Sequence, residues 1–370
     1  MRIKKFFRKV LALGLIVSFG VTLPNYAAVY NLPVPGSFVS LSAKQSYPML
    51  KGIKVDPANP LQLRFIVDCP NKKGVSDQEF KKLVNYFLAA VTLPQEDLWV
   101  NLSPYEQDRI IPEQLALTGL GKDLLGQDYL LKQLTASITS PKSKIGKQYW
   151  NMVNKKVYAL TGKSGVAVNS LNKIWIVPQK ALVKEHGLIA VVSTAKFKVM
   201  LEEDFLATKS NFAKEALSPQ DTAAQTLMRE VILPRIEQDV NFGENFALLR
   251  QMYHSFILAS WFKQKLKKSV YSYYISKNKT DGIAISDKTA KNKIYGLYLE
   301  AYRKGISKFV KTAENKVQHH YYSGGIPMGE GTIGVEKSTA DEIKKDIGPN
   351  ARGGNVDLEL SGGMKNISSV

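Results

Sequence analysis

The sequence predicts an α+β protein with a predominantly helical single core, a small antiparallel β-meander and a flexible Gly-rich C-terminal tail. Two patterns predict this class: long stretches with apolar residues at spacings of three and four, and short β-rich runs between turn residues. Hydrophobic residues make up 44% of the 370-residue chain, which is typical of a globular protein. We expect a signal peptide over 1–27, a Pro-rich linker over 28–55, a mixed helical and β core over 56–322 and a disordered tail over 323–370.

The first segment has the pattern of a secretory signal. Its apolar run from Val10 to Val21 is too short for a membrane span, which needs about 20 residues. Cleavage after Ala27 or Ala28 would give a periplasmic or extracellular protein without a transmembrane span, whereas a retained segment would act as a membrane anchor. The run is preceded by five cationic residues: Arg2, Lys4, Lys5, Arg8 and Lys9.

The single cysteine, Cys69, excludes an intramolecular disulfide, so the fold must be held together by burial. Cys69 also lies far from the signal segment, which excludes a lipid-anchored cysteine directly after it.

The core begins with a strand and a helix. The run Leu61–Asp68 is β-rich and is ended by Pro70. The next stretch, "SDQEFKKLVNYFLAAV", places apolar residues on one helical face, and Ser76 with Glu79 has the spacing of a capping box. Two further helices are expected over 120–138 and 145–160.

The middle of the chain predicts an antiparallel meander. In "NKIWIVPQKALVKEHGLIAVVSTAKFKVMLEED", short apolar runs are separated by Pro178-Gln179 and by His186-Gly187. A glycine reaches φ > 0 easily, so the second connection suits a tight hairpin. The C-terminal half returns to helix over 249–261 and 294–309, with two weaker β-rich runs over 269–286 between them.

The stretch "DLWVNLSPYEQDRIIPEQL" places carboxylates beside serine, tyrosine and tryptophan, as an active site does. We interpret it as the signal that begins a helix, with Ser103 as N-cap, Pro104 at N1 and Glu106 at N3 of a capping box. Pro112 and Glu113 then open another helix.

Nucleotide and metal motifs are absent or incomplete. "YALTGKSG" ends like a phosphate-binding loop, but Val157 stands where the first glycine is required, so Gly162 is interpreted as a helix terminator. The four histidines, among them His186 and His254, lack paired ligand spacing, and one cysteine cannot build a thiolate zinc site. We therefore expect no cofactor and no metal.

Carboxylates are the weak catalytic candidates. Successive acids point in different directions, so the acids that follow "KVML" are better explained as the start of a helix, whose positive end favours them. The alternative is a carboxylate pair for acid–base work that combines this cluster with the acidic island over 96–113, with Tyr105 nearby. The candidates are Glu202, Glu203, Asp204, Glu106 and Asp108.

Charge is distributed unevenly along the chain. The formal net charge is +19, and loss of the five signal cations would leave +14. An acidic island over 95–128 is followed by the segment 129–184, which has no acid and ten lysines, and this charge step is the expected location of a binding surface. A second basic block covers 263–316. Such a protein is attracted to anionic surfaces, while the excess of lysine over arginine and the predicted export argue against specific nucleic-acid binding.

Five motifs carry a resemblance to a known family. "DLWVNLSPYEQDRIIPEQL", "KIWIVPQKALV", "KVMLEEDFLA", "LLRQMYHSFILASWF" and "YYSGG", in this order between Asp56 and Gly325, resemble a family of exported bacterial proteins without an established activity. The resemblance implies an envelope or secreted setting and supplies no catalytic residue.

Two functions are compatible with these patterns. The first, which we favour, is an exported interaction or structural protein whose cationic surface docks an anionic envelope component or a protein partner. The second is a periplasmic or secreted hydrolase that uses carboxylates from the two acidic clusters. The sequence does not predict an oligomeric state.

Overall fold

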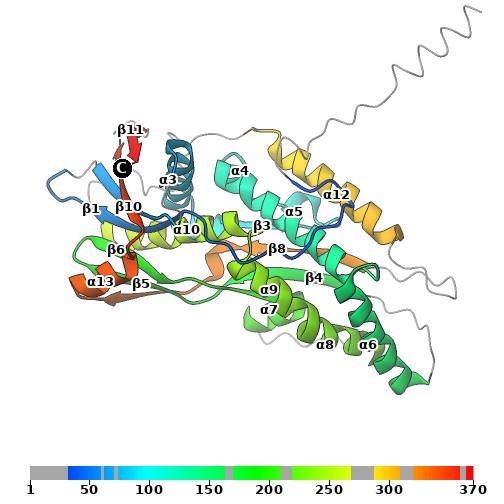
Figure 1. Ribbon diagram of the computed structural model, residues 1–370. Coiled ribbons are helices and arrows are strands. Elements are labelled where there is room, and N and C mark those ends of the chain that lie inside the picture. The colour runs from blue at the N-terminus through cyan, green and yellow to red at the C-terminus, as the bar shows by residue number, and fades with distance from the viewer. Residues whose placement is uncertain are drawn as a thin grey trace, which may run out of the picture. The chain divides into compact units, whose positions relative to one another are not determined.

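The structure is a computed structural model that describes residues 32–59, 62–70, 74–162, 170–209, 219–267, 287–308, 320–358 and 364–369. All of its helices and strands belong to the compact unit Pro33–Val370. The combination of helices with sheets that contain antiparallel strands confirms the predicted α+β class (Figure 1). The predicted signal peptide over 1–27 and the β-rich runs over 269–286 lie outside the described residues.

The larger sheet has seven strands in the order β11-β10-β2-β1-β6-β5-β9. Its strands are β1 (Met49–Val55), β2 (Gln62–Asp68), β5 (Ala181–His186), β6 (Ile189–Thr194), β9 (Ile333–Lys337), β10 (Ala351–Leu358) and β11 (Met364–Ser369). Neighbouring strands are antiparallel, except that β5 and β9 run parallel. The predicted strand after residue 60 is confirmed as β2, in the interior of this sheet.

The smaller sheet has four strands in the order β3-β8-β4-β7. Its strands are β3 (Trp99–Leu102), β4 (Ser170–Pro178), β7 (Phe197–Leu201) and β8 (His320–Pro327). β8 runs parallel to β4 and antiparallel to β3, so residues far apart in the sequence become neighbours in this sheet.

The described helices are α3 (Asp77–Thr92), α4 (Glu113–Ala116), α5 (Gly119–Thr139), α6 (Lys144–Thr161), α7 (Glu202–Lys209), α8 (Pro219–Leu227), α9 (Leu233–Phe242), α10 (Ala247–Leu266), α12 (Ala290–Lys308) and α13 (Ala340–Ile347). Five of them, α3, α5, α6, α10 and α12, are the helices that hydrophobic periodicity predicts. Short turns are η1 (Gln95–Asp97), η2 (Gln107–Arg109), the π-helical η3 (Met228–Ile232) and η4 (Met328–Glu330). The predicted capping box of α3 is confirmed, since the side chains of Ser76 and Glu79 bind each other's backbone N–H.

The core of the larger sheet is built on α3 and α10, which pack against each other and against β1. Edge-to-face contacts join Phe65 of β2 to Phe87 of α3 (ring centroids 5.1 Å apart) and Phe87 to Phe262 of α10 (5.6 Å). Such aromatic pairs stabilise a core beyond the area that they bury. α5 packs on β3 and β8 of the smaller sheet, and α12 packs on α5.

The predicted meander is wrong beyond its central hairpin. β5 and β6 do pair around Gly187, which has a φ of 60°. β4, however, pairs with β7. Pro178 at the end of β4 lies opposite Phe197 at the start of β7, and the β5–β6 hairpin is the stretch of chain between these two residues. The hairpin β5–β6 is therefore inserted between two paired strands and extends into the other sheet.

The C-terminal segment, expected to be a disordered tail from 323, instead contributes strands to both sheets, with α13 between them. β10 covers the edge of β2, and Gly354 explains why this glycine-rich strand is ordered. A Cβ at Gly354 would lie 2.3 Å from the ring of Phe80, so the absence of a side chain lets α3 pack directly on the strand.

The expected linker over 28–55 also differs from the structure, because β1 begins at Met49. The residues before β1 lie against helices: the Tyr129 hydroxyl donates to the Pro33 carbonyl (2.7 Å), and the Val39 N–H donates to Ser137 Oγ (2.9 Å). Residues 33–48 are therefore bonded to the folded unit, although Pro35 is the one buried residue among them, and β1 belongs to the larger sheet, so the domain boundary at 56 does not hold.

Candidate functional site

The acids after "KVML" begin α7, as predicted, where the helix N-terminus favours negative charge. They do not face a common point. Arg229 of η3 binds Glu203 through Nη2 (3.2 Å) and Asp204 through Nε (2.8 Å). Glu202 points elsewhere, to Lys173 of β4 (3.1 Å). Glu203 and Asp204 thus clamp α7 to the π-helical turn, which is a structural role.

The structure does bring one acid of each cluster together. Lys173 Nζ lies 3.1 Å from Glu202 Oε1 and 3.7 Å from Glu106 Oε2, so the two carboxylates are at most about 7 Å apart, a separation that glycoside chemistry allows. The ammonium group, however, lies between them, where a substrate would have to enter. The pair is therefore a three-member ion cluster, defined here as the Lys173 cluster.

The pKa of Glu106 argues against a role as general acid. Burial raises it, but the hydrogen bond from Asn101 Nδ2 (2.7 Å) and the charges of Lys173 and Arg109 outweigh burial and hold the pKa below its ordinary value. A general acid at neutral pH needs a raised pKa.

The other candidates of the acidic island, Asp108 and Tyr105, do not belong to the Lys173 cluster. Asp108 is exposed in η2, and the Tyr105 hydroxyl lies 3.0 Å from the Tyr302 hydroxyl.

The predicted capping box at Ser103 is wrong. Pro104 and Tyr105 form a turn, the 3₁₀ turn η2 begins only at Gln107, and it has no side-chain cap. Glu106 binds Asn101 and Lys173 instead of a helix N-terminus. The helix predicted after Pro112 is present as the short α4.

Two sequence motifs have local structural roles. Gly162 ends α6 with a φ of 66°, which confirms that it terminates a helix. His254 Nδ1 on α10 lies 3.2 Å from the Leu50 carbonyl oxygen. His186 is the last residue of β5, beside the hairpin turn. Within the described ranges, no group of three His, Cys, Asp or Glu side chains could hold a metal ion.

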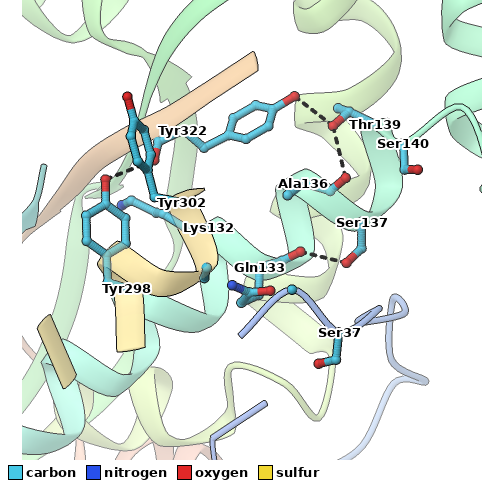
Figure 2. A pocket seen from close by; sticks show the side chains of 12 residues that line it. Ser37, Lys132, Gln133, Ala136, Ser137, Thr139, Ser140, Tyr298, Tyr302 and Tyr322 are labelled. Atoms are coloured by element: carbon cyan, nitrogen blue, oxygen red, sulfur yellow. Dashed lines mark hydrogen bonds between the residues drawn. The ribbon is translucent and has the colours of Figure 1, made fainter. Parts of the chain in front are cut away.

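A cavity of about 40 Å³ lies beside α5, lined by Lys132, Thr139, Tyr298, Tyr302 and Tyr322 among others (Figure 2). The lysine is buried and pairs with the buried Asp128, whose other oxygen accepts the Leu102 N–H (2.9 Å). Burial lowers the pKa of Lys132 and raises that of Asp128.

Several polar groups of this cavity are already paired. The Tyr322 hydroxyl lies 2.6 Å from Thr139 Oγ1, and the Tyr298 hydroxyl donates to the Tyr322 carbonyl (3.3 Å), as Figure 2 shows. Because Lys132 is held by Asp128 and the cavity has room for little more than a water molecule, we interpret the buried pair as a structural link between α5 and β3.

The acid-free segment over 129–184 contains α6, which is attached to the protein along one stripe only. Its buried face is formed by Tyr149, Trp150, Val153 and Val157 and packs on α5, α8 and η3. Tyr149 donates its hydroxyl to the Ala224 carbonyl of α8 (3.3 Å). Gly146 is also buried and Ile145 and Thr161 are half-buried, whereas the remaining positions of α6 are exposed; none of them is an acid.

The outward stripe of α6 is cationic. Residues three and four apart lie on one helix face, and this spacing joins Lys144, Lys147, Asn151, Lys155 and Tyr158, all of which are exposed. This set is defined here as the α6 stripe.

Apolar side chains are exposed along α6 as well. Tyr158 of the α6 stripe is 58% exposed, and Met152, one position from Asn151 at the side of the stripe, is 41% exposed. Leu160, two positions from Tyr158 and so on another face of the helix, is 56% exposed. A groove of about 750 Å³ separates Met152 from η3 and α9, and the acid that lines it is Glu230. α6 therefore presents lysines and apolar groups together to solvent.

Comparison with known protein families, curated proteins and solved structures found no match to this chain. Among the described residues, no helix is long and apolar enough to cross a membrane.

Proposed function

We propose that this is an exported bacterial interaction protein that binds an anionic lipid surface through the α6 stripe. The observation that carries the proposal is an exposed helix with lysines at helical spacing and no acid. Each lysine near such a surface contributes about 1 kcal/mol to binding. The signal pattern of residues 1–27 and the resemblance to exported proteins support an envelope setting.

A lipid surface fits α6 better than an anionic polymer does. The exposed Tyr158 in the stripe and Met152 at its side add apolar contact that head groups and acyl chains can cover, whereas a polymer would use the lysines alone. Specific nucleic-acid recognition would favour the arginine fork, and α6 contains no arginine.

The alternative, a hydrolase that uses Glu106 with Glu202, rests on their approach to a common lysine. Two observations weigh against it: the cation occupies the space between the carboxylates, and the pKa of Glu106 is lowered rather than raised. We therefore rank this function second.

Vesicle flotation tests the proposal. The chain from residue 28 is mixed with phosphatidylcholine vesicles, with or without phosphatidylglycerol. We expect binding only to the anionic vesicles, with steep loss between about 50 and 500 mM NaCl as charges are screened. The variant Lys144→Gln/Lys147→Gln/Lys155→Gln is expected to bind about 10- to 100-fold more weakly.

A matched control is the variant Lys54→Gln/Lys81→Gln/Lys196→Gln, which removes the same charge from exposed positions outside α6. It should bind almost as the parent does. Equal loss in both variants would show that net charge, and not α6, drives adsorption. Binding that salt leaves unchanged, or no binding to anionic vesicles, would reject the proposal.

A further inference from the structure

A cleft of about 540 Å³ lies beside the smaller sheet and is unrelated to α6. Its lining comes from η1, β3, η2, β4, α7, β8 and η4 and includes Trp99, Asn101, Arg109, Trp175, Lys209 and Glu330. This set is defined here as the tryptophan cleft. It combines two indole rings with an amide and with charges of both signs.

Two buried polar atoms in this lining have no hydrogen-bond partner: Asn101 Oδ1, an acceptor, and Trp175 Nε1, a donor. Asn101 is only 8% exposed. A buried polar group without a partner costs about 1–3 kcal/mol, so native proteins seldom retain one without a reason. One donor and one acceptor left open in the same cleft indicate a site for a ligand that offers both.

The positions of these groups are set by the fold. Trp99 and Asn101 are two residues apart in β3 and so share one face of the strand, as Lys173 and Trp175 do in β4. β8 lies between these strands, and its Gly325 lies opposite Asn101. A Cβ at Gly325 would lie 2.0 Å from the Val100 carbonyl oxygen. The glycine therefore permits the close packing of the strands that bear the cleft residues.

Both side chains are also held in place. Trp175 stacks on Phe205 with ring centroids 4.7 Å apart and an interplanar angle of 18°. Asn101 donates through Nδ2 to Glu106, which belongs to the Lys173 cluster. Glu106, one of the two acids that resemble a catalytic pair, thus positions Asn101 and leaves its carbonyl oxygen unused.

We propose that the tryptophan cleft binds a neutral saccharide. A sugar hydroxyl both donates and accepts, so neighbouring hydroxyls of one ring can satisfy Asn101 Oδ1 and Trp175 Nε1 together. Two acids, Glu96 and Glu330, balance Arg109 and Lys209 in the lining, which favours a neutral ligand over a polyanion. Apolar ring faces of a saccharide suit the indole surfaces.

Access requires a local rearrangement, because both unpaired atoms are shielded from water. Lys209 of α7 and Glu330 of η4 form an ion pair of 2.5 Å within the lining, with side chains 43% and 36% exposed. An exposed pair of this kind contributes little to stability. A ligand can therefore displace it on entering the cleft.

Isothermal titration calorimetry with chitotriose and cellotriose, and with triglycine as a non-saccharide probe, tests this inference. We expect one of the two sugars to bind. The variant Trp175→Phe keeps the stacked ring and removes the N–H, so the affinity for that sugar should fall at least 10-fold while the Tm is unchanged or raised.

The matched control is Trp150→Phe. Trp150 Nε1 donates to the Thr139 carbonyl (2.8 Å), so this variant should lower the Tm and leave sugar binding intact. Absence of binding to both sugars, binding of triglycine in their place, or equal affinity of the Trp175→Phe protein would overturn the assignment. Vesicle binding through α6 uses none of these residues, so the two proposals fail independently.

Discussion

At the scale of the residue, His254 shows how burial changes an ordinary side chain. The imidazole lies on α10 against the Leu50 carbonyl, with Lys51 and Arg250 nearby. Burial, reinforced by these two cations, lowers its pKa to about 4, although the hydrogen bond to Leu50 acts in the opposite direction. The folded protein therefore keeps the ring neutral at a pH where the unfolded chain protonates it.

This lowered pKa predicts a pH dependence of stability. Between pH 6.5 and about 4 the unfolded state binds a proton that the folded state does not, so the free energy of unfolding should fall as pH decreases through this window, by about 3 kcal/mol. Urea unfolding at a series of pH values measures it. In the His254→Phe variant this part of the pH dependence should vanish; an unchanged pH profile in that variant would contradict the buried neutral ring.

At the scale of the element, hydrophobic periodicity predicts the long helices, whereas strand partners do not follow from the sequence. The helices α3, α5, α6, α10 and α12 follow from apolar spacing, which acts within a few residues. Strand partners depend on residues far away: β4 pairs with β8 across some 150 positions, and no local signal indicates it.

The candidate site shows the same division. The sequence identified Glu202 as a helix start and located the basic segment that contains α6. It did not identify Asn101 and Trp175, because an unpaired polar atom is defined by its surroundings and not by its residue type.

The C-terminal tail shows how a glycine can favour packing. Disorder is expected there because the segment is rich in Gly, Ser and Asn and poor in large apolar residues, yet Gly354 permits the contact between β10 and Phe80 of α3. Its neighbour Gly353 has no atom within 4 Å of an added Cβ. Adjacent residues of one strand thus differ in whether they tolerate a side chain.

This difference predicts opposite outcomes for two single substitutions. Gly354→Ala should lower the free energy of unfolding by about 1–3 kcal/mol, because the methyl group overlaps the Phe80 ring. Gly353→Ala should be neutral or slightly stabilising, since it only restricts the unfolded chain. Thermal and urea unfolding of both variants provide the measurement, and neutrality of both would show that the C-terminal segment is not packed on α3.

At the scale of the whole molecule, the N-terminal residues 33–45 connect helices that are distant in the sequence. We define them as the N-terminal strap. The strap joins α5 through the bonds of Pro33 and Val39 and then reaches the end of α9, where Ser42 binds the buried Asp239 through both its N–H (3.2 Å) and its hydroxyl. Signal cleavage after Ala27 or Ala28 would leave the strap in the mature chain.

Removal of the strap should therefore destabilise the whole fold. A chain that begins at residue 46 loses these four hydrogen bonds and two more that Asn245 donates to Ser42 Oγ (3.0 Å) and to the Ser40 carbonyl (2.9 Å). The Asp239 carboxylate then keeps Asn245 Nδ2 (2.8 Å) as its remaining side-chain donor. At about 1 kcal/mol for each bond, the free energy of unfolding should fall by about 3–6 kcal/mol, measured by urea unfolding. A chain that begins at residue 32 keeps every strap contact and is the control.

Because the shorter chain can fail to fold, Ser42→Ala offers a milder test, with an expected loss of about 1–2 kcal/mol in the free energy of unfolding. Equal stability of the chains that begin at 32 and at 46 would mean that these residues merely rest on the surface, as a linker does.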